Sequence, residues 1–343
     1  MQKNIAVFLM VCLSIFGTLE ICGGETRSVP RPEKTHLTYV EPGRYLIKLP
    51  VILAEAKDFF KEEGLSVDVK IAPGQRVYEA LLAGHSDFIC VSYGSMMKIN
   101  QQGKKVISVG NITRNCLFHL VGYSDIKTIE DLKGKRIGVP KVGEEVTAVI
   151  RAALKRKGLD PDKDVNWLAV GIEATMVAAM KNRKVDAVGA VGEWRDHLIR
   201  AVADTHVLID YSQESALKEY LGASTYPLAH IQITSEFIEK YPETTQRIVN
   251  AIMKSLQFIN THTPKECIDV VWKKYWGDAD RAILIKYLTE IKNAFSRDGI
   301  TKKEGYEAVV RVNHEAGLLD LPAPPFEEIT YFKFIQNANK NLK

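Results

Sequence analysis

Two stretches of this chain repeat the same order of local signals, about a hundred residues apart. The first contains EGLSVDV at residues 63–69 and ALLAGHSDFICV at residues 80–91. The second contains KGLDPDKDVNWLAV at residues 157–170 and AMKNRKVDAVGAV at residues 179–191. Each copy predicts a helix that ends at Gly-Leu, a strand, a second helix, an aspartate and a final strand. Two similar α/β units predict a groove between them, and a groove is a place for a ligand.

The rest of the chain continues this alternation of strands and helices. Further strands are predicted at residues 37–40, 106–109, 117–123, 136–139, 207–209 and 228–234. Amphipathic helix predominates from residue 244, with breaks at Pro264, Gly277 and Gly299. Such an order predicts mostly parallel sheets wrapped by helices, which bind ligands beyond the carboxyl ends of their strands. The loops selected by that rule are 41–48, 73–76, 92–94, 141–145 and 192–194.

The composition is that of an ordinary globular protein. A chain of 343 residues is long enough for two domains, and 46% of its residues are hydrophobic while 26% are charged. The net charge of +4 is small, and no basic stripe alternates with aromatic residues. Nucleic acid is therefore not an expected partner.

The first 24 residues have the anatomy of a signal peptide. Lys3 precedes an apolar run at Ile5–Phe16, and small residues follow at 22–24. We expect export to the periplasm or another extracytoplasmic location, with residues 25–36 as a polar leader. Acylation of Cys22 is an alternative form of the same export, although Glu20 and Ile21 stand where small residues are favoured.

The cysteines predict neither a disulfide framework nor a metal site. Removal of the signal would leave three of the five, namely Cys90, Cys116 and Cys267, at wide spacings. No Cys-x-x-Cys or His-x-x-x-His pair is present. We therefore expect no metal and no cofactor.

Several blocks in order resemble the nitrate/sulfonate/taurine and thiamine-precursor solute-binding proteins. They include Pro50-x-x-x-Ala54 with Phe59-Phe60-x-x-Glu63-Gly64-Leu65, and the run from Ala80 to Phe88. They continue with DLKGKRIGVP at residues 131–140, Gly158-Leu159-Asp160-Pro161, Val185-Asp186-Ala187 and Tyr241-Pro242-Glu243. The resemblance covers residues 37–262, and its strength lies in the order and spacing of the blocks.

The resemblance implies an α/β fold of the two-lobed periplasmic-binding-protein type (type II). Each lobe would be a mostly parallel sheet wrapped by helices, with two crossover strands as a hinge near 120–123 and 226–230. The implied division is 37–122 for the first part of lobe 1, 123–225 for lobe 2 and 226–262 for the return to lobe 1. The helices of 263–343 would pack mainly on lobe 1.

The implied function is the substrate-binding component of an ABC importer. A monomer would capture a small organic solute between its lobes and deliver it to the permease subunits. Two alternatives stay open: an exported sensor domain for a signalling partner, and a thiamine-pyrimidine-related enzyme. The enzyme is disfavoured because the cysteine-rich motif of that relative is absent. In addition, His85 and Ser92 lie at opposite ends of a strand, which excludes a catalytic triad with Asp87.

The start of the helix after residue 143 is a candidate for solute choice. Family members that bind small anions resemble one another in having Ser and Thr there, whereas this chain has Gly143, Glu144 and Glu145. The glutamates either complement the helix dipole or accept hydrogen bonds from an amine-like or pyrimidine-like solute. Both readings make a nitrate or sulfonate solute less expected, and the solute is predicted to be amine-like or pyrimidine-like, with a sulfonate-like solute as the alternative.

Other candidate ligand contacts follow the predicted strands. Glu193 and Trp194 are expected to supply an acceptor and a stacking wall, unless Trp194 packs in the core of the next helix. Ser92 and Tyr93 directly follow a buried strand and are expected at the pocket. The remaining candidates are Arg44, Tyr45 and Tyr226. Asp87 and Asp186 are expected to be structural.

Overall fold

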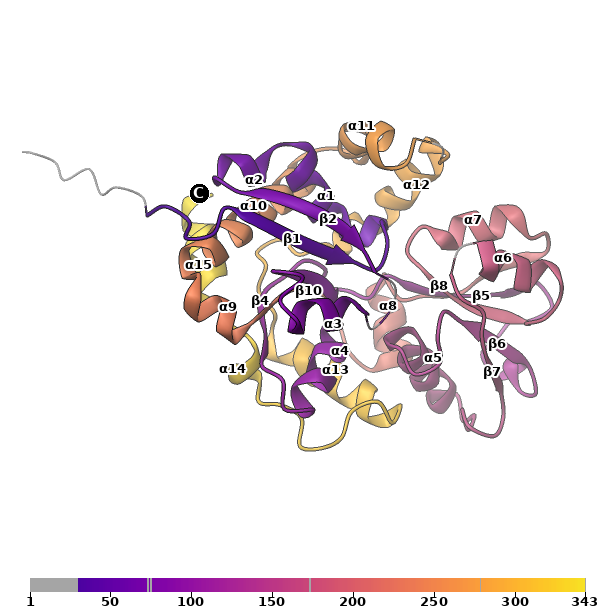
Figure 1. Cartoon of the computed structure of the whole chain (residues 1–343). Helices are drawn as coiled ribbons and strands as arrows, with labels where there is room; N and C mark the ends of the chain where they lie inside the picture. Colours follow the sequence, from indigo (N-terminus) through magenta and orange to yellow (C-terminus); the bar gives the residue numbers. More distant parts are fainter. Residues whose placement is uncertain (1–29, 73, 75, 173, 278, 343) are drawn as a thin grey trace, which may run out of the picture. The chain divides into compact units, whose positions relative to one another are not determined.

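The computed structural model describes residues 30–72, 74, 76–172, 174–277 and 279–342. The predicted signal peptide, with Cys22, and residues 25–29 of the predicted leader lie outside the described residues. From Arg31 onward the chain forms one unit with two groups of strands, which we call the first and the second lobe (Figure 1).

The first lobe contains two small sheets built from the first part of the chain and one returning strand. The parallel pair is β1 (His36–Glu41) and β2 (Ser66–Ile71). The other sheet has the order β3-β10-β4, from β3 (Ile89–Ser92), β10 (Ala229–Thr234) and β4 (Val106–Asn111). A parallel bridge between Tyr39 and Phe88 joins the two sheets.

The second lobe is one five-stranded sheet with the order β7-β6-β8-β5-β9. Its strands are β5 (Phe118–Tyr123), β6 (Arg136–Val139), β7 (Asn166–Ala169), β8 (Ala187–Val191) and β9 (Thr205–Asp210). Alternation along β8 sends Ala187 to the core beneath α5 (Glu145–Arg156). Val188 and Ala190 face α6 (Ala174–Lys181) and α7 (Trp194–Ala201) instead. Helices therefore cover both faces of the sheet.

Parallel and antiparallel pairs both occur, which corrects the prediction of mostly parallel sheets. β6 runs parallel to β7 and β8, whereas β5 is antiparallel to β8 and β9, and β10 is antiparallel to β3 and β4. The exceptions have one cause. The parallel strands end at the side of each sheet that faces the other lobe. β5 and β10 each enter their lobe from the other lobe, and they therefore begin at that side. The α/β fold class with two lobes is otherwise as predicted.

Helices fill the spaces between and around the sheets. Those of the first half are α1 (Leu49–Ala56), α2 (Phe59–Glu62), α3 (Arg76–Leu82) and α4 (Tyr93–Gln101), with short turns η1 (Leu46–Lys48) and η2 (Glu130–Leu132). The return passes through α8 (Glu214–Ala216) and η3 (Leu217–Leu221) before β10, and α9 (Ser235–Lys240) follows it.

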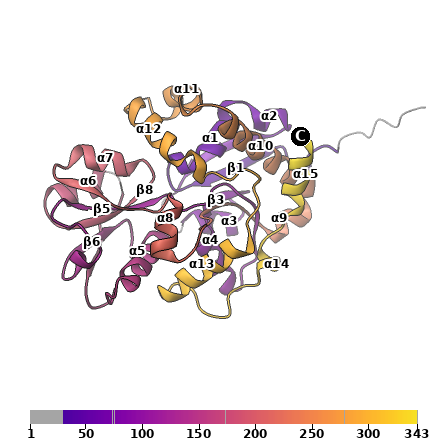
Figure 2. The same cartoon turned by 180° about the vertical axis from the view of Figure 1, so that it is seen from behind.

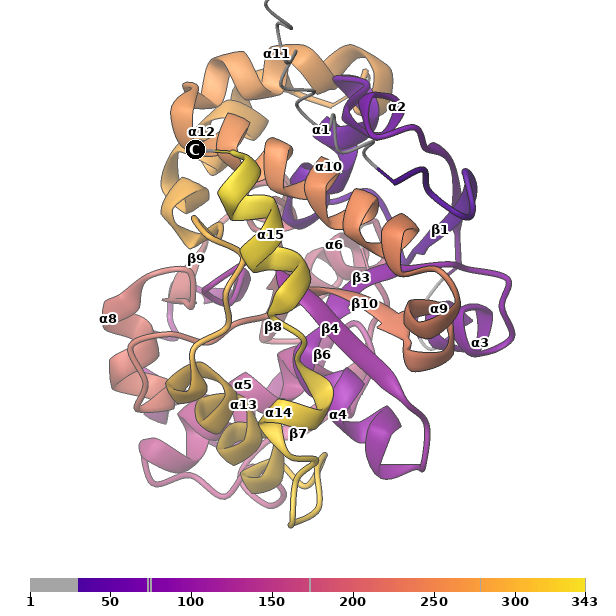
Figure 3. The same ribbon diagram turned by 90° about the vertical axis from the view of Figure 1, so that its left-hand side faces the viewer.

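The last hundred residues are mostly amphipathic helix, as predicted. They comprise α10 (Pro242–Thr261), α11 (Pro264–Tyr275), α12 (Arg281–Ile291), η4 (Lys292–Ala294), α13 (Lys303–Glu315), α14 (Phe326–Ile329) and α15 (Lys333–Asn341). The predicted break at Pro264 is the start of α11, where Thr263 and Glu266 form a capping box. α13 packs against α4 and α5 (Figure 2), and α15 packs along α10 (Figure 3).

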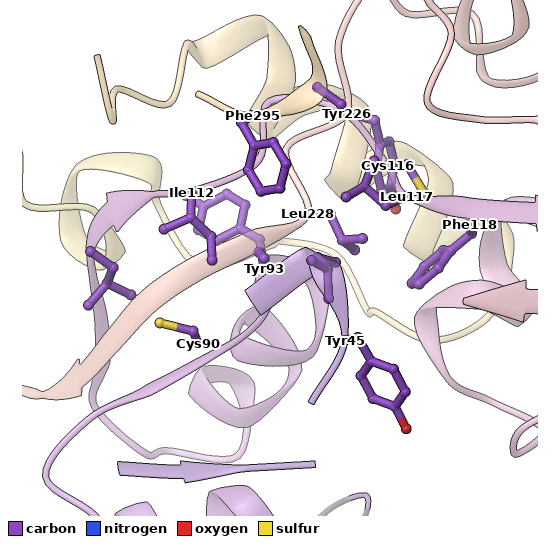
Figure 4. Close-up of a cluster of buried hydrophobic side chains, with 14 of the residues drawn as sticks. Tyr45, Cys90, Tyr93, Ile112, Cys116, Leu117, Phe118, Tyr226, Leu228 and Phe295 are labelled. Carbon is purple, nitrogen blue, oxygen red and sulfur yellow. The ribbon is translucent and has the colours of Figure 1, made fainter. Parts of the chain in front are cut away.

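The chain crosses between the lobes twice. The first crossing lies at residues 112–117, just before the predicted 120–123, because β5 pairs with β8 from Phe118 onward. The second lies at residues 211–228 and includes Tyr226, whose backbone nitrogen donates to the carbonyl of Arg114 at 3.2 Å. Apolar side chains from both crossings, among them Cys116 and Leu228, gather beside Phe295 in the core (Figure 4).

Candidate functional site

A cavity of about 580 Å³ lies between the two lobes. Its lining comes from the strand ends and loops of both lobes and from the start of β10. The apolar lining residues are Pro42, Tyr45, Ile47, Val77, Val91, Phe118, Pro140, Val146, Ile172, Met176, Val191, Trp194, Leu228 and Ala229. The polar and charged ones are Lys48, Arg76, Tyr78, Ser92, Ser95, Lys141, Glu144 and Glu145. A concave, mostly apolar space with a few polar groups is the usual form of a small-molecule site.

Burial separates a floor from a mouth. Lys48, Leu228 and Ala229 are each less than 5% exposed and belong to the floor. Arg76 and Lys141 are exposed and lie at the mouth. A solute in this cavity would therefore meet mainly apolar surface inside, with the Lys48 side chain at the floor, and two further charged side chains near the entrance.

The structure brings five of the ten predicted ligand contacts to this cavity. They are Tyr45, Ser92, Glu144, Glu145 and Trp194. Trp194 is half-buried and packs its ring against His197, with 5.0 Å between ring centroids. Tyr45 reaches the cavity from the first lobe, where its ring lies so close to Gly43 that a Cβ there would touch it.

The other five lie outside the cavity lining. Arg44 turns away, 3.5 Å from the carboxylate of Glu41, with its guanidinium over the ring of Tyr275. Tyr93 is fully buried in the core, where it stacks on His230 and its hydroxyl bonds to that of Thr330 at 2.6 Å. Tyr93 is the first residue of α4, and its side chain packs in the core instead of lining the cavity.

Gly143, Glu193 and Tyr226 also have other surroundings. Gly143 lines a second hollow of about 380 Å³ beside the cavity. Glu193 is buried and accepts a hydrogen bond from the backbone nitrogen of Leu46, in the first lobe, at 3.0 Å. Tyr226 is buried, and its hydroxyl donates to Glu145.

The adjacent glutamates at the start of α5 differ sharply. Glu145 is buried, and its carboxylate accepts hydrogen bonds from Ser92 Oγ at 2.9 Å and Asn313 Nδ2 at 2.8 Å. Glu144 is half-buried at the cavity wall, opposite Gly74, and its carboxylate forms no hydrogen bond or ion pair within the part of the chain that is described. Burial raises the pKa of the Glu144 carboxyl, while the charge of Lys141 opposes this.

A buried charged cluster lies beneath the cavity floor. Neither carboxylate oxygen of Glu41 has a hydrogen-bond partner among the described residues, and burial raises the pKa of Glu41 to about 7. Lys48 contributes to the floor and donates from Nζ to the carbonyl of Cys90. Burial also lowers the pKa of Lys48, because the charged ammonium loses its water.

Sequence reasoning did not single out Tyr78, Phe118 or Lys48, although Lys48 is the last residue of the predicted loop 41–48. Tyr78 lies one turn into α3, and its hydroxyl donates to Gln232 at 2.8 Å beside the cavity. The predicted loop 73–76 does contribute to the cavity lining, but its predicted range ends two residues before Tyr78. Phe118 is the first residue of β5, which is antiparallel to β8 and so begins at the cleft, and no local signal in the sequence marks this direction.

The described residues contain neither a candidate metal cluster nor a candidate membrane-spanning helix. No cluster of three or more His, Cys, Asp and Glu side chains there could hold a metal ion. Within the described ranges no helix combines the length and the apolar character needed to span a bilayer. The three described cysteines, Cys90, Cys116 and Cys267, are free and buried.

Solved structures share this architecture. A protein from Bordetella bronchiseptica RB50 superposes with a TM-score of 0.79, covering 91% of this chain and 99% of that one at 22% identity. The ligand-binding component of an ABC-type import system from Staphylococcus aureus gives 0.70, covering 89% and 98% at 13% identity. The fold is therefore that of the two-lobed periplasmic binding proteins.

Sequence comparison gives the family. The NMT1/THI5-like family matches residues 48–266, and the chain belongs to this family. YtlA of Bacillus subtilis, which is named a binding protein, is 24% identical over 84% of this chain and 86% of its own length. A yeast relative, THI13 of Saccharomyces cerevisiae, is named a 4-amino-5-hydroxymethyl-2-methylpyrimidine phosphate synthase and is 23% identical over 70% of this chain and 69% of its own.

Proposed function

We propose that this chain is the substrate-binding component of an ABC importer and captures a small organic solute between its lobes. The observation that carries the proposal is the apolar cavity of about 580 Å³, which takes residues from both lobes. A solute that contacts both lobes binds the closed arrangement more tightly than an open one and shifts the population toward it. The moving bodies would be divided at the two crossings, close to the predicted limits of 37–122, 123–225 and 226–262, with β5 moving as part of the second lobe.

The solute class that we propose is a flat molecule with amino or amidine donors, such as an aminopyrimidine. Glu144 supports this choice, because it presents a carboxylate without a partner among the described side chains at the wall of an apolar cavity. Trp194 and Tyr45 offer aromatic surface on the same cavity. The delivery step would take place outside the cytoplasm, with the permease subunits as partners.

A thermal-shift screen followed by calorimetry tests the solute class. The probes are aminopyrimidines, alkylamines, alkanesulfonates and aromatic acids. We expect an aminopyrimidine to bind with a Kd of about 1 µM or lower, equivalent to about −8 kcal/mol. Glu144→Gln should weaken that binding roughly 10-fold or more, because a charge-assisted hydrogen bond contributes about 1.5–3 kcal/mol.

The control is Glu239→Gln, which removes an exposed carboxylate from α9, outside the cavity lining. It should leave the affinity unchanged. Tight binding of a sulfonate that is indifferent to Glu144→Gln would contradict the amine or pyrimidine class. Absence of binding to every class would contradict the proposed function itself.

A further inference from the structure

The carboxylate of Glu145 is held by side chains from three other segments of the chain. Ser92 Oγ donates to Oε2 at 2.9 Å, Asn313 Nδ2 donates to Oε1 at 2.8 Å, and the hydroxyl of Tyr226 donates to Oε1 as well. Asn313 Nδ2 also lies 3.1 Å from the Tyr226 hydroxyl. The carboxylate is therefore satisfied by neutral donors, and it is 5% exposed.

These groups belong to different parts of the fold. Glu145 begins α5 of the second lobe, whereas Ser92 ends β3 of the first lobe. Asn313 lies on α13, and Tyr226 lies on the second crossing. The hydrogen bond to Ser92 joins the two lobes directly, so separation of the lobes would break it.

Gly94 shows how closely the two lobes approach at this point. A Cβ placed on Gly94 would overlap the carboxylate of Glu145 and lie 2.7 Å from Asn313 Nδ2. Only a residue without a side chain fits at this position of α4 while Glu145 is in place. The contact is therefore a close fit between α4 of the first lobe and α5 of the second.

The same contacts leave Glu145 poorly placed to bind a solute. Its oxygens already accept three hydrogen bonds, and the backbone of α4 closes one side. Its neighbour Glu144 is the carboxylate at the cavity wall without such partners within the described residues. Glu144 therefore faces the cavity, whereas Glu145 faces hydrogen-bond donors of the protein itself.

We propose that Glu145 and Asn313 are positioning residues that latch the second lobe onto the first and so place Glu144 at the cavity wall. This inference rests on the proposed function, because it assigns the closed arrangement of the same cleft. A buried carboxylate is costly when it loses its donors. Removal of the Asn313 amide should therefore favour an open cleft, in which Glu145 regains water.

The test measures opening and needs no solute. Small-angle X-ray scattering gives the radius of gyration, and hydrogen–deuterium exchange reports on the first turn of α5. The central variant is Asn313→Asp, which places a second carboxylate against Glu145. We expect a larger radius of gyration at pH 7.5 and about tenfold faster exchange in that turn.

Acid should reverse this effect in Asn313→Asp alone. Two adjacent carboxyls share a proton at low pH, so the variant should close again near pH 5. The other titratable neighbours of Glu145 are Glu144, the Tyr78 and Tyr226 hydroxyls and the Cys116 thiol. Burial raises the pKa of each of these tyrosines and of Cys116, which keeps them neutral over this range. A purely structural role for Asn313 would not produce acid-induced closure.

Asn250 supplies a matched control. Its Nδ2 donates to a carboxylate oxygen of Glu63 at 3.0 Å, but both residues lie in the first-lobe region of the structure. Asn250→Asp should lower stability without opening the cleft. Equal opening in Asn250→Asp, or an unchanged radius and exchange rate in Asn313→Asp, would overturn the latch.

A second variant covers a failure to fold, and two outcomes distinguish the inference from the proposed function. If Asn313→Asp does not fold, Ser92→Ala removes one donor from the same carboxylate without added charge, and unchanged exchange in α5 then refutes the latch. If the variants open as expected but no solute in the screen binds, the role of Glu145 and Asn313 in holding the lobes together is supported and the proposed function is contradicted. If a solute binds while the variants stay closed, the proposed function is supported and the role of Glu145 and Asn313 in holding the lobes together is contradicted.

Discussion

The two repeated units are alike up to the end of one strand and differ directly after it. Asp87 accepts a hydrogen bond from the backbone nitrogen of Thr38 in β1, and Asp186 accepts one from that of Arg136 in β6, both at 2.8 Å. Beyond the strands, Ser92 caps α4 and bonds across the cleft, whereas Glu193 is buried against the backbone of η1. The shared part builds each lobe, and the part that differs makes the contacts between the lobes.

Removal of the repeated aspartates should have the largest effect. Asp186 also binds the guanidinium of Arg136 through both oxygens, at 3.0 and 2.9 Å, while Asp87 pairs with Lys34. Because hydrogen bonds to charged groups contribute about 1.5–3 kcal/mol, we expect Asp186→Ala to cost roughly 3 kcal/mol and Asp87→Ala roughly 2. Urea unfolding of each variant measures this. Losses below about 0.5 kcal/mol for both would show that the aspartates do not secure the repeat.

The strands that precede the two copies also differ at their ends, where Glu41 of β1 is buried in the first lobe and Val139 of β6 is buried in the second. The pKa of Glu41 is raised from 4.5 to about 7 by burial. The folded protein therefore binds this proton more tightly than the unfolded chain, and stability falls as the pH rises from about 4.5 to about 7.

Glu41→Gln should remove that part of the pH profile. Above pH 7 the variant should be more stable by about 2 kcal/mol, and near pH 4 it should equal the wild type. Denaturant unfolding between pH 4 and pH 8 makes the comparison. A variant that loses stability at pH 8 would instead show that the ion pair with Arg44 outweighs the cost of burying the charge.

Much of this architecture could be predicted from the sequence, because it depends on local signals. Hydrophobic periodicity, Gly stops and the two aspartates located the elements, and the structure places Ser92 at the end of β3 and Trp194 shortly after β8, at the cleft. Strand direction could not be predicted, because β5 and β10 are antiparallel owing to the crossings between the lobes.

The division of the site between solute contacts and protein contacts was also beyond sequence reasoning. Glu144 and Glu145 are adjacent and of the same type, so no local pattern assigns them different roles. Their roles differ in the folded chain because Ser92 and Asn313 donate hydrogen bonds to Glu145, and Asn313 lies 168 residues further along the sequence. Tyr93 follows Ser92 directly, yet the first turn of α4 sends it into the core. Such assignments depend on which distant segment packs against a residue, and no local pattern records this.

The smallest expected effect concerns how each copy ends its second helix. Gly84 and Arg183 both lie three residues before the aspartate with φ of +71° and +51°. The capping hydrogen bonds match, from His85 to Ala80 and from Lys184 to Ala179. Only glycine adopts this conformation without strain, so Gly84→Ala should cost about 1 kcal/mol.

Arg183→Gly should change stability by less than about 0.5 kcal/mol, because two terms oppose each other. Relief of the left-handed strain, about 1 kcal/mol, is offset by loss of the guanidinium contact with the ring of Tyr123, 3.5 Å from its centroid. The double variant Arg183→Gly with Tyr123→Leu, compared with Tyr123→Leu alone, separates the terms. There the glycine should stabilise by the full strain energy, and a neutral result would mean that the second copy carries no strain at Arg183.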